Sequence, residues 1–322
     1  MTDGGSMIEA AAEDAGEQQA VLEALWKIPG FEAIRADEFT VERQGGMTNL
    51  VYKLDFGNQR CILRIPGKGT EEYIDRAVEL HNARVAAAAG MAAEVIYGDE
   101  TSGIMLTRFI DGIVTMSPQR FKERAGSPAR AGRALKQMHA CGKEFRFRFE
   151  LFAMIDDYLG ILAKQEAELP EGYTTVVEAA QPLRAALDAH PLPLAPCHCD
   201  PLCENFLDDG DKMWVVDWEY SGMNDPIWDL GDLSVEAGFD AAQDAEMMTA
   251  YCGGAPSAAV MGRMVVYKAM CDLLWTLWGL IQHANGNPAE DFWAYSIGRF
   301  ERCQKLMQDP AFAGHIEAVR KG

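Results

Sequence analysis

Two hydrophobic patterns divide this chain of 322 residues. Up to about residue 112, short stretches rich in β-branched and aromatic residues predict β-strands. Two helical stretches, 18–28 and 71–89, interrupt them. After Gly112, apolar residues recur three and four positions apart over longer stretches, which predicts helices. We therefore expect an α+β fold, with a small, mainly antiparallel β part and a larger, mostly helical one.

The strands of the first part are predicted at 39–44, 50–56, 61–65, 94–97 and 104–109. Gly57 and Asn58 separate the second and third of these, which predicts an antiparallel hairpin with a two-residue turn. In the second part, helices are predicted at 129–141, 151–168, 176–190 and 259–283. One β hairpin lies between these helices, with strands at 205–207 and 213–216 around an acidic turn.

These patterns give an expected organisation of two lobes. Residues 1–16 are small and acidic and are expected to form a disordered tail. Residues 17–112 are expected to form a first lobe that includes a hinge, and residues 113–322 a second lobe. A chain of this length suits one large domain or two lobes that share an interface.

The composition narrows the partners and the compartment. With 49 acidic against 29 basic residues, the formal net charge is −20. Such a surface repels phosphate backbones and anionic lipid, so we expect no nucleic-acid partner and no membrane insertion. We expect no signal peptide, and no uninterrupted apolar run approaches the length of a bilayer. The eight cysteines are scattered, so reduced thiols in a cytoplasmic protein are expected.

One segment contains the residue types that phosphoryl transfer requires. It runs from His198 through Asp200 to Asn205, and Asp217 follows at the end of a short apolar stretch. Phosphoryl transfer needs a carboxylate that orients or deprotonates the attacking hydroxyl, and oxygen ligands for metal ions. Asp200 and Asn205 stand five apart, which is the spacing of the kinase catalytic loop. Oxygen donors of this kind suit Mg²⁺.

The residues 198–205 and 215–226 together resemble the choline and ethanolamine kinases, part of the broader aminoglycoside-phosphotransferase-like group. The resemblance implies a two-lobed, protein-kinase-like fold and ATP as the phosphoryl donor. It further implies that Asp200 is the catalytic base and that His198 braces the loop. Asn205 and Asp217 would then be the Mg²⁺ ligands.

Two other interpretations of the segment were weighed against this one. The first is a turn-rich hairpin with solvated acids, which does not explain why several residues with specific roles occur in order. The second is a metal site formed by Cys197, His198, Cys199 and Cys203. This spacing lacks the two-residue gap that lets two thiolates converge on one zinc ion. Cys199 and Cys203 do depart from the family, in which Asn and Pro are more usual at these positions.

The first lobe contains a second match to the same family. Between two predicted strands, the sequence Gly-Gly-Met-Thr-Asn resembles the Gly-Gly-Met-Ser-Asn turn of choline kinases. Backbone N–H groups in such a turn can bind phosphate oxygens. The resemblance therefore assigns nucleotide binding to Gly45, Gly46, Met47, Thr48 and Asn49.

Further nucleotide-binding residues are expected in the strands and the helix of this lobe. Arg64 stands where choline kinases carry an arginine, and a guanidinium can bind phosphate with two hydrogen bonds. Glu79, in the following helix, is its expected ion-pair partner. Phe109 and Ile110 match the hinge, whose backbone groups would hydrogen-bond the adenine.

The last third of the chain indicates the acceptor. A quaternary ammonium cannot donate a hydrogen bond, so a site for it uses aromatic faces and a nearby carboxylate. Trp275 and Trp278 stand three apart in one predicted helix and resemble the Trp-x-x-Trp helix of choline kinases. Tyr295 and Glu236 match further pocket positions of that family. The alternative is that the two tryptophans are ordinary core residues.

We interpret the chain as a kinase that uses ATP and Mg²⁺ to phosphorylate the hydroxyl of choline, a small cationic amino alcohol. Ethanolamine, thiamine and aminoglycosides are the alternative acceptors. A choline-binding sensor on a kinase scaffold is the alternative of a different class. A pure binding protein has no need of Asp200, Asn205 and Asp217 together, which favours the enzyme. The sequence does not fix the oligomeric state.

Overall fold

The computed structural model describes residues 16–45, 49–67 and 74–322. By its internal contacts the chain separates into two compact units, which divide between Asp111 and Gly112. The tail predicted at 1–16 lies outside the described residues, except for Gly16. This glycine begins a helix over residues 16–25, which lies within the predicted helical stretch apart from its first two residues.

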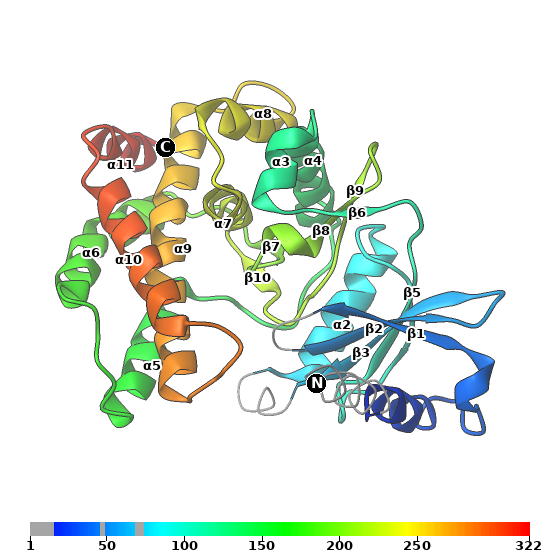
Figure 1. The fold of residues 1–322 in the computed structure, drawn as a ribbon. Coiled ribbons are helices and arrows are strands. Elements are labelled where there is room, and N and C mark those ends of the chain that lie inside the picture. The colour runs from blue at the N-terminus through cyan, green and yellow to red at the C-terminus, as the bar shows by residue number, and fades with distance from the viewer. Residues whose placement is uncertain (1–15, 46–48, 68–73) are drawn as a thin grey trace, which may run out of the picture. The chain divides into compact units, whose positions relative to one another are not determined.

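The described residues of the first unit contain a five-stranded antiparallel sheet (Figure 1). Its strands, in spatial order, are β1 (Thr40–Gly45), β2 (Asn49–Asp55), β3 (Arg60–Pro66), β5 (Met105–Arg108) and β4 (Val95–Gly98). All five occur where the sequence predicts strands. The turn between β2 and β3 contains Gly57 at φ 83°, a left-handed conformation that glycine adopts without steric cost.

One helix of this unit, α2 (Arg76–Ala88), packs on the sheet beside β4. It begins after Asp75, whose side chain accepts hydrogen bonds from the amides of Ala77 and Val78. The predicted start at residue 71 lies outside the described residues. A separate cluster fills the core between the sheet and the helix at 16–25, with Leu25, Leu54 and Leu63 fully buried. A short 3₁₀ turn, Ala36–Glu38, leads into β1.

The second unit is mostly helical (Figure 1). Its helices are α3 (Pro118–Glu123), α4 (Ser127–His139), α5 (Leu151–Lys164), α6 (Tyr173–Ala189), α7 (Ile227–Ala237), α8 (Ala241–Cys252), α9 (Ala258–Ala284), α10 (Phe292–Met307) and α11 (Phe312–Lys321). Helix α9 is the centre of this unit, because α5, α7, α10 and α11 all pack against it. A helix that is covered on several sides must be apolar around most of its circumference.

Helix α9 is the one helix in the described ranges that is long and apolar enough to cross a membrane. The sequence expectation considered only uninterrupted apolar runs and therefore missed it. Of its most apolar 18-residue window, 83% is buried inside the protein. This burial is typical of the core helix of a folded domain.

Two small sheets interrupt the helices of the second unit. The predicted hairpin is present as β8 (Phe206–Asp208) and β9 (Met213–Val215), and β6 (Val114–Thr115) adds a third strand that was not predicted. The second sheet, β7 (Ala195–Cys197) with β10 (Gly222–Asn224), was not predicted either. Unlike β8 and β9, which an acidic turn joins directly, these three short strands pair with partners far along the chain, so no local turn marks them.

The close approach of α4 and α8 depends on a missing side chain. A Cβ atom at Gly132 in α4 would lie 2.3 Å from the carbonyl oxygen of Met247 in α8.

We predict that Gly132→Ala lowers the free energy of unfolding by about 1–3 kcal/mol, because the helices must move apart. Gly160→Ala in α5 is the matched control, since its Cβ meets no atom within 4 Å. It should raise the free energy of unfolding by about 0.5–1 kcal/mol. Urea denaturation of both variants tests this, and two changes of the same sign would contradict it.

Candidate active site

The segment with the predicted catalytic residues is closed at its base by the small sheet of β7 and β10. Strand β7 ends at Cys197, directly before His198, and β10 begins at Gly222. These two end residues are paired across the sheet. The segment 198–221 therefore leaves the sheet and returns to the same place, which fixes both of its ends.

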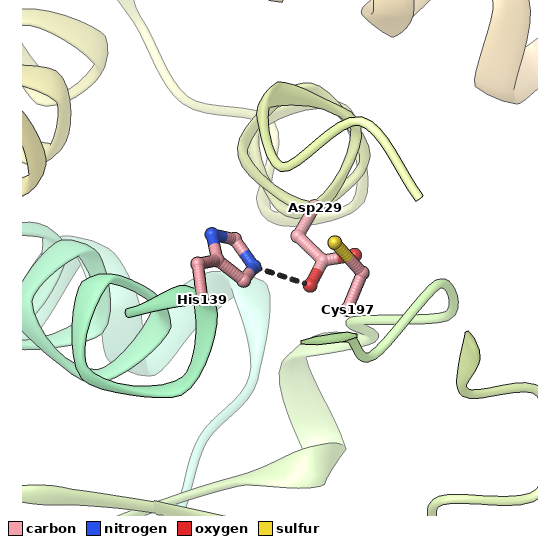
Figure 2. Close-up of side chains that lie close together, drawn as sticks. All are labelled: His139, Cys197 and Asp229. Atoms are coloured by element: carbon pink, nitrogen blue, oxygen red, sulfur yellow. Dashed lines mark hydrogen bonds and ion pairs between the residues drawn. The ribbon is translucent and has the colours of Figure 1, made fainter. Parts of the chain in front are cut away.

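The carboxylate of Asp229, in the first turn of α7, fixes the beginning of this segment. Its Oδ2 accepts a hydrogen bond from the amide of His198 at 2.7 Å, and its Oδ1 accepts one from the amide of Cys199 at 2.9 Å. Figure 2 shows that His139 of α4 reaches the same carboxylate, with Nε2 at 3.0 Å from Oδ2. The other ring nitrogen of His139 lies 3.0 Å from the hydroxyl of Tyr251. A fully buried carboxylate thus joins α4, α7 and the segment.

Asp229 was not predicted as a site residue. An acid in the first turn of a helix usually stabilises its own helix dipole, and that ordinary role hides any other. The signal that could have identified it is its place three residues after Pro226, at the end of the family-like sequence.

The segment contains two residues in a left-handed conformation that is unfavourable for side chains other than glycine. Cys199 has φ 68° and Asp217 has φ 65°. Such residues cost about 1–3 kcal/mol each and persist only where surrounding interactions enforce them. At Cys199, the hydrogen bond from its amide to Asp229 is such an interaction. Cys199 stands directly before Asp200, and Asp217 is itself a predicted metal ligand.

His198 connects the two ends of the segment. Its Nε2 lies 2.8 Å from the carbonyl oxygen of Val216, and because a carbonyl only accepts, Nε2 must bear the hydrogen. Burial lowers the pKa of His198, so the imidazole is neutral near pH 7. Its ring centroid lies 4.8 Å from that of Trp218. His198 thereby holds the chain on both sides of Asp217.

Asn205 occupies a 3₁₀ turn (Cys203–Asn205) and bonds back to the start of the segment. The side-chain Nδ2 of Asn205 donates to the backbone carbonyl of Asp200 at 3.1 Å. The backbone carbonyl of Asn205 accepts from the amide of Val216 at 3.0 Å. The first bond orients the side-chain amide and leaves Oδ1 as the atom that can ligate a metal. The structure thus links the predicted base to both predicted metal ligands through the backbone.

The carboxyl of Asp200 lies in an electrostatic environment that disfavours its charge. Burial raises the pKa of Asp200 to about 7, and the negative charges of Glu236 and Glu219 add to the effect, while Arg299 opposes it. The negative charge of Glu236 contributes to the raised pKa of Asp200, so the predicted acceptor residue and the predicted base lie in one neighbourhood of the second unit.

The three predicted aromatic residues converge, with Trp278 of α9 at their centre. Its ring centroid lies 6.2 Å from that of Trp275 and 5.9 Å from that of Tyr295 in α10. Two further aromatic residues, which the sequence analysis missed, complete this aromatic cluster. The indole N–H of Trp278 donates to the hydroxyl of Tyr220 at 3.1 Å, and the Phe292 centroid lies 5.6 Å from that of Trp278. All of these ring pairs meet edge to face or tilted, as aromatic quadrupoles prefer.

Burial distinguishes the members of the aromatic cluster. Trp275 is only 4% exposed, which is typical of a core residue. Tyr220, Trp278 and Tyr295 are half-buried, which suits side chains that line a site. The burial of Tyr220, Trp278 and Tyr295 therefore suits the cation-site interpretation, whereas that of Trp275 suits the core interpretation.

Glu236, the predicted acidic wall, has a partner in the protein. Both of its oxygens accept hydrogen bonds from Arg299 in α10, Oε1 at 2.5 Å and Oε2 at 2.9 Å. The guanidinium carbon of Arg299 also lies 4.5 Å from the centroid of the Tyr295 ring. The sequence analysis did not identify Arg299, since one arginine in an amphipathic helix gives no distinctive pattern.

In the first unit, Arg64 of β3 forms an ion pair with Glu79 of α2. Glu79 is buried and also accepts from Arg76, with Nη1 2.8 Å from Oε2. Burial disfavours the charged form of Glu79, but the two arginines outweigh it and lower the pKa below its ordinary value. A carboxylate between two guanidinium groups leaves this part of the first unit with a surplus of positive charge.

Of the other predicted nucleotide-binding residues, some belong to the described strands and hinge, and the rest lie outside the described ranges. Gly45 ends β1 with φ 104°, and the buried Asn49 begins β2. Gly46, Met47 and Thr48 lie outside the described residues. At the predicted hinge, the amide of Phe109 donates to the carbonyl of Arg60 at 3.1 Å. Ile110 follows it outside any strand.

The alternative metal site of Cys197, His198, Cys199 and Cys203 is not assembled. Among the described side chains, Cys197 lies within ion-sharing distance of His139 and Asp229, whereas Cys199 and Cys203 belong to no such group. All eight cysteines are free, as expected. Burial raises the pKa of Cys199 well above its ordinary value, which favours the thiol over the thiolate that zinc requires.

Comparisons with known proteins identify the family. The model of the phosphotransferase enzyme family matches residues 40–264. A choline/ethanolamine kinase family protein from Mesorhizobium loti is 57% identical, over 94% of this chain and 99% of that one, with a TM-score of 0.87. The chain belongs to the choline/ethanolamine kinase family, within the phosphotransferase enzyme family.

Two further relatives carry more specific names. The choline kinase LicA from Streptococcus pneumoniae is 27% identical over 91% of this chain and 99% of that one, with a TM-score of 0.75, and LicA has also been solved with AMP. Ethanolamine kinase 2 from Mus musculus is 26% identical over 85% of this chain and 77% of that one. The expected α+β, protein-kinase-like fold and the expected class, a phosphotransferase with an alcohol acceptor, are confirmed.

The role of Asp229 in this kinase can be tested by replacing one oxygen of its carboxylate. Asp229→Asn replaces an acceptor oxygen by an amino group, which then faces a backbone N–H or the His139 ring. We predict that the free energy of unfolding falls by about 1–3 kcal/mol and that kcat falls, because a buried donor loses its acceptor. Asp240→Asn is the matched control, since Asp240 is exposed and caps α8, where Asn serves equally well. Urea denaturation and turnover are measured, and equal effects in the two variants would contradict the role of Asp229.

The raised pKa of Asp200 has a consequence for stability. Below about pH 4 the group is protonated in both the folded and the unfolded chain. As pH rises toward 7, the unfolded chain ionises first, so the wild type loses stability that an uncharged residue would keep. We predict that Asp200→Asn raises Tm relative to the wild type, and by more at pH 8 than at pH 4.5. Thermal melts at both pH values test this, and a pH-independent difference in Tm would contradict the shifted pKa.

Proposed function

We propose that this enzyme transfers the γ-phosphoryl group of ATP to the hydroxyl of choline, in the cytoplasm and with Mg²⁺. The observation that carries the proposal is the aromatic cluster in the same neighbourhood as a carboxylate and Asp200. Half-buried rings of Tyr220, Trp278 and Tyr295 suit a cation that binds through aromatic faces. The family relationship to a choline kinase supports the same acceptor.

Asp200 is the proposed catalytic base. With a pKa of about 7, its carboxylate is a stronger proton acceptor than an ordinary aspartate and is still substantially ionised at neutral pH. It would orient the hydroxyl of choline and accept its proton as the phosphoryl group is transferred. Asp229 and His198 would act indirectly, because Asp229 binds the two amides directly before Asp200, and His198 binds the backbone beside Asp217.

Asn205 and Asp217 are the proposed Mg²⁺ ligands. The fit rests on donor chemistry, since the oriented Oδ1 of Asn205 and the carboxylate of Asp217 are the hard oxygen donors that Mg²⁺ prefers. When bound, the ion neutralises charge on the phosphate oxygens. The hydrogen bonds of Asn205 to the backbone keep these donors in place before any ion arrives.

In the first unit, we assign nucleotide binding to the phosphate turn at 45–49, to Arg64 and to the hinge at Phe109 and Ile110. The ion pair with Glu79 would hold the guanidinium of Arg64 in position. Because the amide of Phe109 is occupied by Arg60, the adenine contacts would come from the carbonyl of Phe109 and the backbone of Ile110.

Ethanolamine is the second candidate acceptor, and the relationship to an ethanolamine kinase favours it. A primary ammonium donates three hydrogen bonds and needs acceptors more than aromatic faces. Glu236, the predicted acidic wall, already accepts two hydrogen bonds from Arg299. We therefore favour choline.

A coupled assay of ADP release tests the proposal with choline, ethanolamine, thiamine and kanamycin at equal concentrations. We predict turnover that requires Mg²⁺ and prefers choline. Asp200→Ala should abolish turnover while leaving ATP binding, measured by calorimetry, intact. Preference for another amine would refute choline as the acceptor. A near-normal kcat in Asp200→Ala would refute the assignment of the base.

A further inference from the structure

Arg299 connects the carboxylate and the aromatic face that the proposed acceptor site offers to a cation. Its Nη1 and Nη2 donate to the two oxygens of Glu236 at 2.5 and 2.9 Å. Its guanidinium carbon lies 4.5 Å from the centroid of the Tyr295 ring, within cation–π distance. The Arg299 side chain is 7% exposed, so these contacts are buried. A cation of the protein therefore already occupies one aromatic face and both oxygens of the carboxylate.

The charges around this group balance one another. Asp272 of α9 accepts from Arg302 through both oxygens, with Nε at 2.7 Å from Oδ2. It lies 3.3 Å from Nη1 of Arg299. Two carboxylates, Glu236 and Asp272, are thus matched by two guanidinium groups. The negative charge of Glu236 is compensated within the protein before any substrate binds.

A third acid in the group does not alter this balance. Asp232 of α7 is fully buried and accepts from the thiol of Cys271 at 3.1 Å. Burial raises the pKa of Asp232 well above its ordinary value, and the charge of Glu236 adds to the effect. Because burial and the charge of Glu236 favour the uncharged form of Asp232, and its Oδ1 already accepts from Cys271, we take Glu236 as the carboxylate of this helix that a substrate cation would meet.

The geometry of the pair affects two kinds of ammonium differently. A primary ammonium gains most from a carboxylate when lone pairs point at its N–H groups. The two parallel hydrogen bonds from the Arg299 guanidinium, here called the fork, use one lone pair on each oxygen of Glu236 and fix the plane of the carboxylate. A quaternary ammonium has no N–H group, so it loses nothing from this arrangement. It binds through the ring faces and the diffuse field instead.

We propose that Arg299 sets the preference of this enzyme for a quaternary over a primary ammonium acceptor, by holding both oxygens of Glu236 and one face of Tyr295. Arg299 is a positioning residue, because it acts through these two side chains. The inference rests on the proposed function, since it requires an amino-alcohol acceptor.

The test compares acceptor selectivity in the wild type and in Arg299→Met, which keeps the approximate length of the side chain and removes the fork. The quantity measured is the ratio of kcat/KM for choline to kcat/KM for ethanolamine. We expect the ratio to fall at least about tenfold, mainly through a lower KM for ethanolamine, because Glu236 then accepts a charge-assisted hydrogen bond. The uncompensated negative charge attracts both amines, so the ratio isolates the effect of the fork. The KM for MgATP should stay within about twofold.

Arg302→Met is the matched control. Arg302 lies one turn along the same helix, carries the same charge and pairs with Asp272, while its Nη2 is 3.8 Å from Glu236. Its substitution should leave the selectivity ratio unchanged within about twofold. An unchanged ratio in folded Arg299→Met would overturn the inference, and so would an equal shift in Arg302→Met.

Two further outcomes are decided in the same experiment. If Arg299→Met does not fold, Arg299→Lys replaces it, because an ammonium binds one oxygen of Glu236 and releases the other. The ratio should then fall about threefold, and no change would overturn the inference. If the wild type phosphorylates neither amine, the proposed function fails and the inference fails with it. If the wild type is active but the ratio does not respond, the inference alone fails.

Discussion

The geometry of the candidate active site depends on one buried carboxylate that accepts hydrogen bonds from three groups on two other parts of the chain. Asp229 receives the amides of His198 and Cys199 and the imidazole of His139. The position of Asp200 is therefore set through the backbone, independently of which side chain stands at position 199. This explains how Cys can replace the more usual Asn there. Asn tolerates a left-handed conformation better than Cys, and the backbone bond to Asp229 helps to hold Cys199 in that conformation.

The chemical character of Asp200 follows from the absence of a direct ionic partner. Several buried acids of the second unit are bonded to arginine: Asp208 to Arg124 and Arg130, Asp225 to Arg263, and Asp272 to Arg302. Within the described ranges, no arginine or lysine forms an ion pair with Asp200. Arg299 affects it only through its charge. Several structural acids are thus held by guanidinium groups, whereas the carboxyl of Asp200 has a raised pKa and no such direct partner among the described residues.

The sequence predicted those features that depend on local patterns. Short stretches rich in β-branched and aromatic residues located the strands of the first unit, and the spacing of Asp200 and Asn205 marked the candidate catalytic segment. The features that it did not predict depend on contacts between distant residues. Asp229 binds an amide 31 positions earlier, and Arg299 binds Glu236 across 63 positions. Strands β7 and β10 pair residues 25 or more positions apart over only three positions each. No periodic signal marks such pairs, because each residue by itself has an ordinary explanation.

The central position of α9 also has a consequence for how the chain is made. Two of the helices that cover it, α10 and α11, follow it in the sequence. During synthesis, an apolar helix long enough to cross a membrane emerges before these partners exist. Until the last residues are translated, part of its surface has nothing within the chain to cover it, and exposed apolar surface of this kind promotes aggregation. The C-terminal helices α10 and α11 thus complete the cover of the core helix, and the order of synthesis makes them the last part of that cover to form.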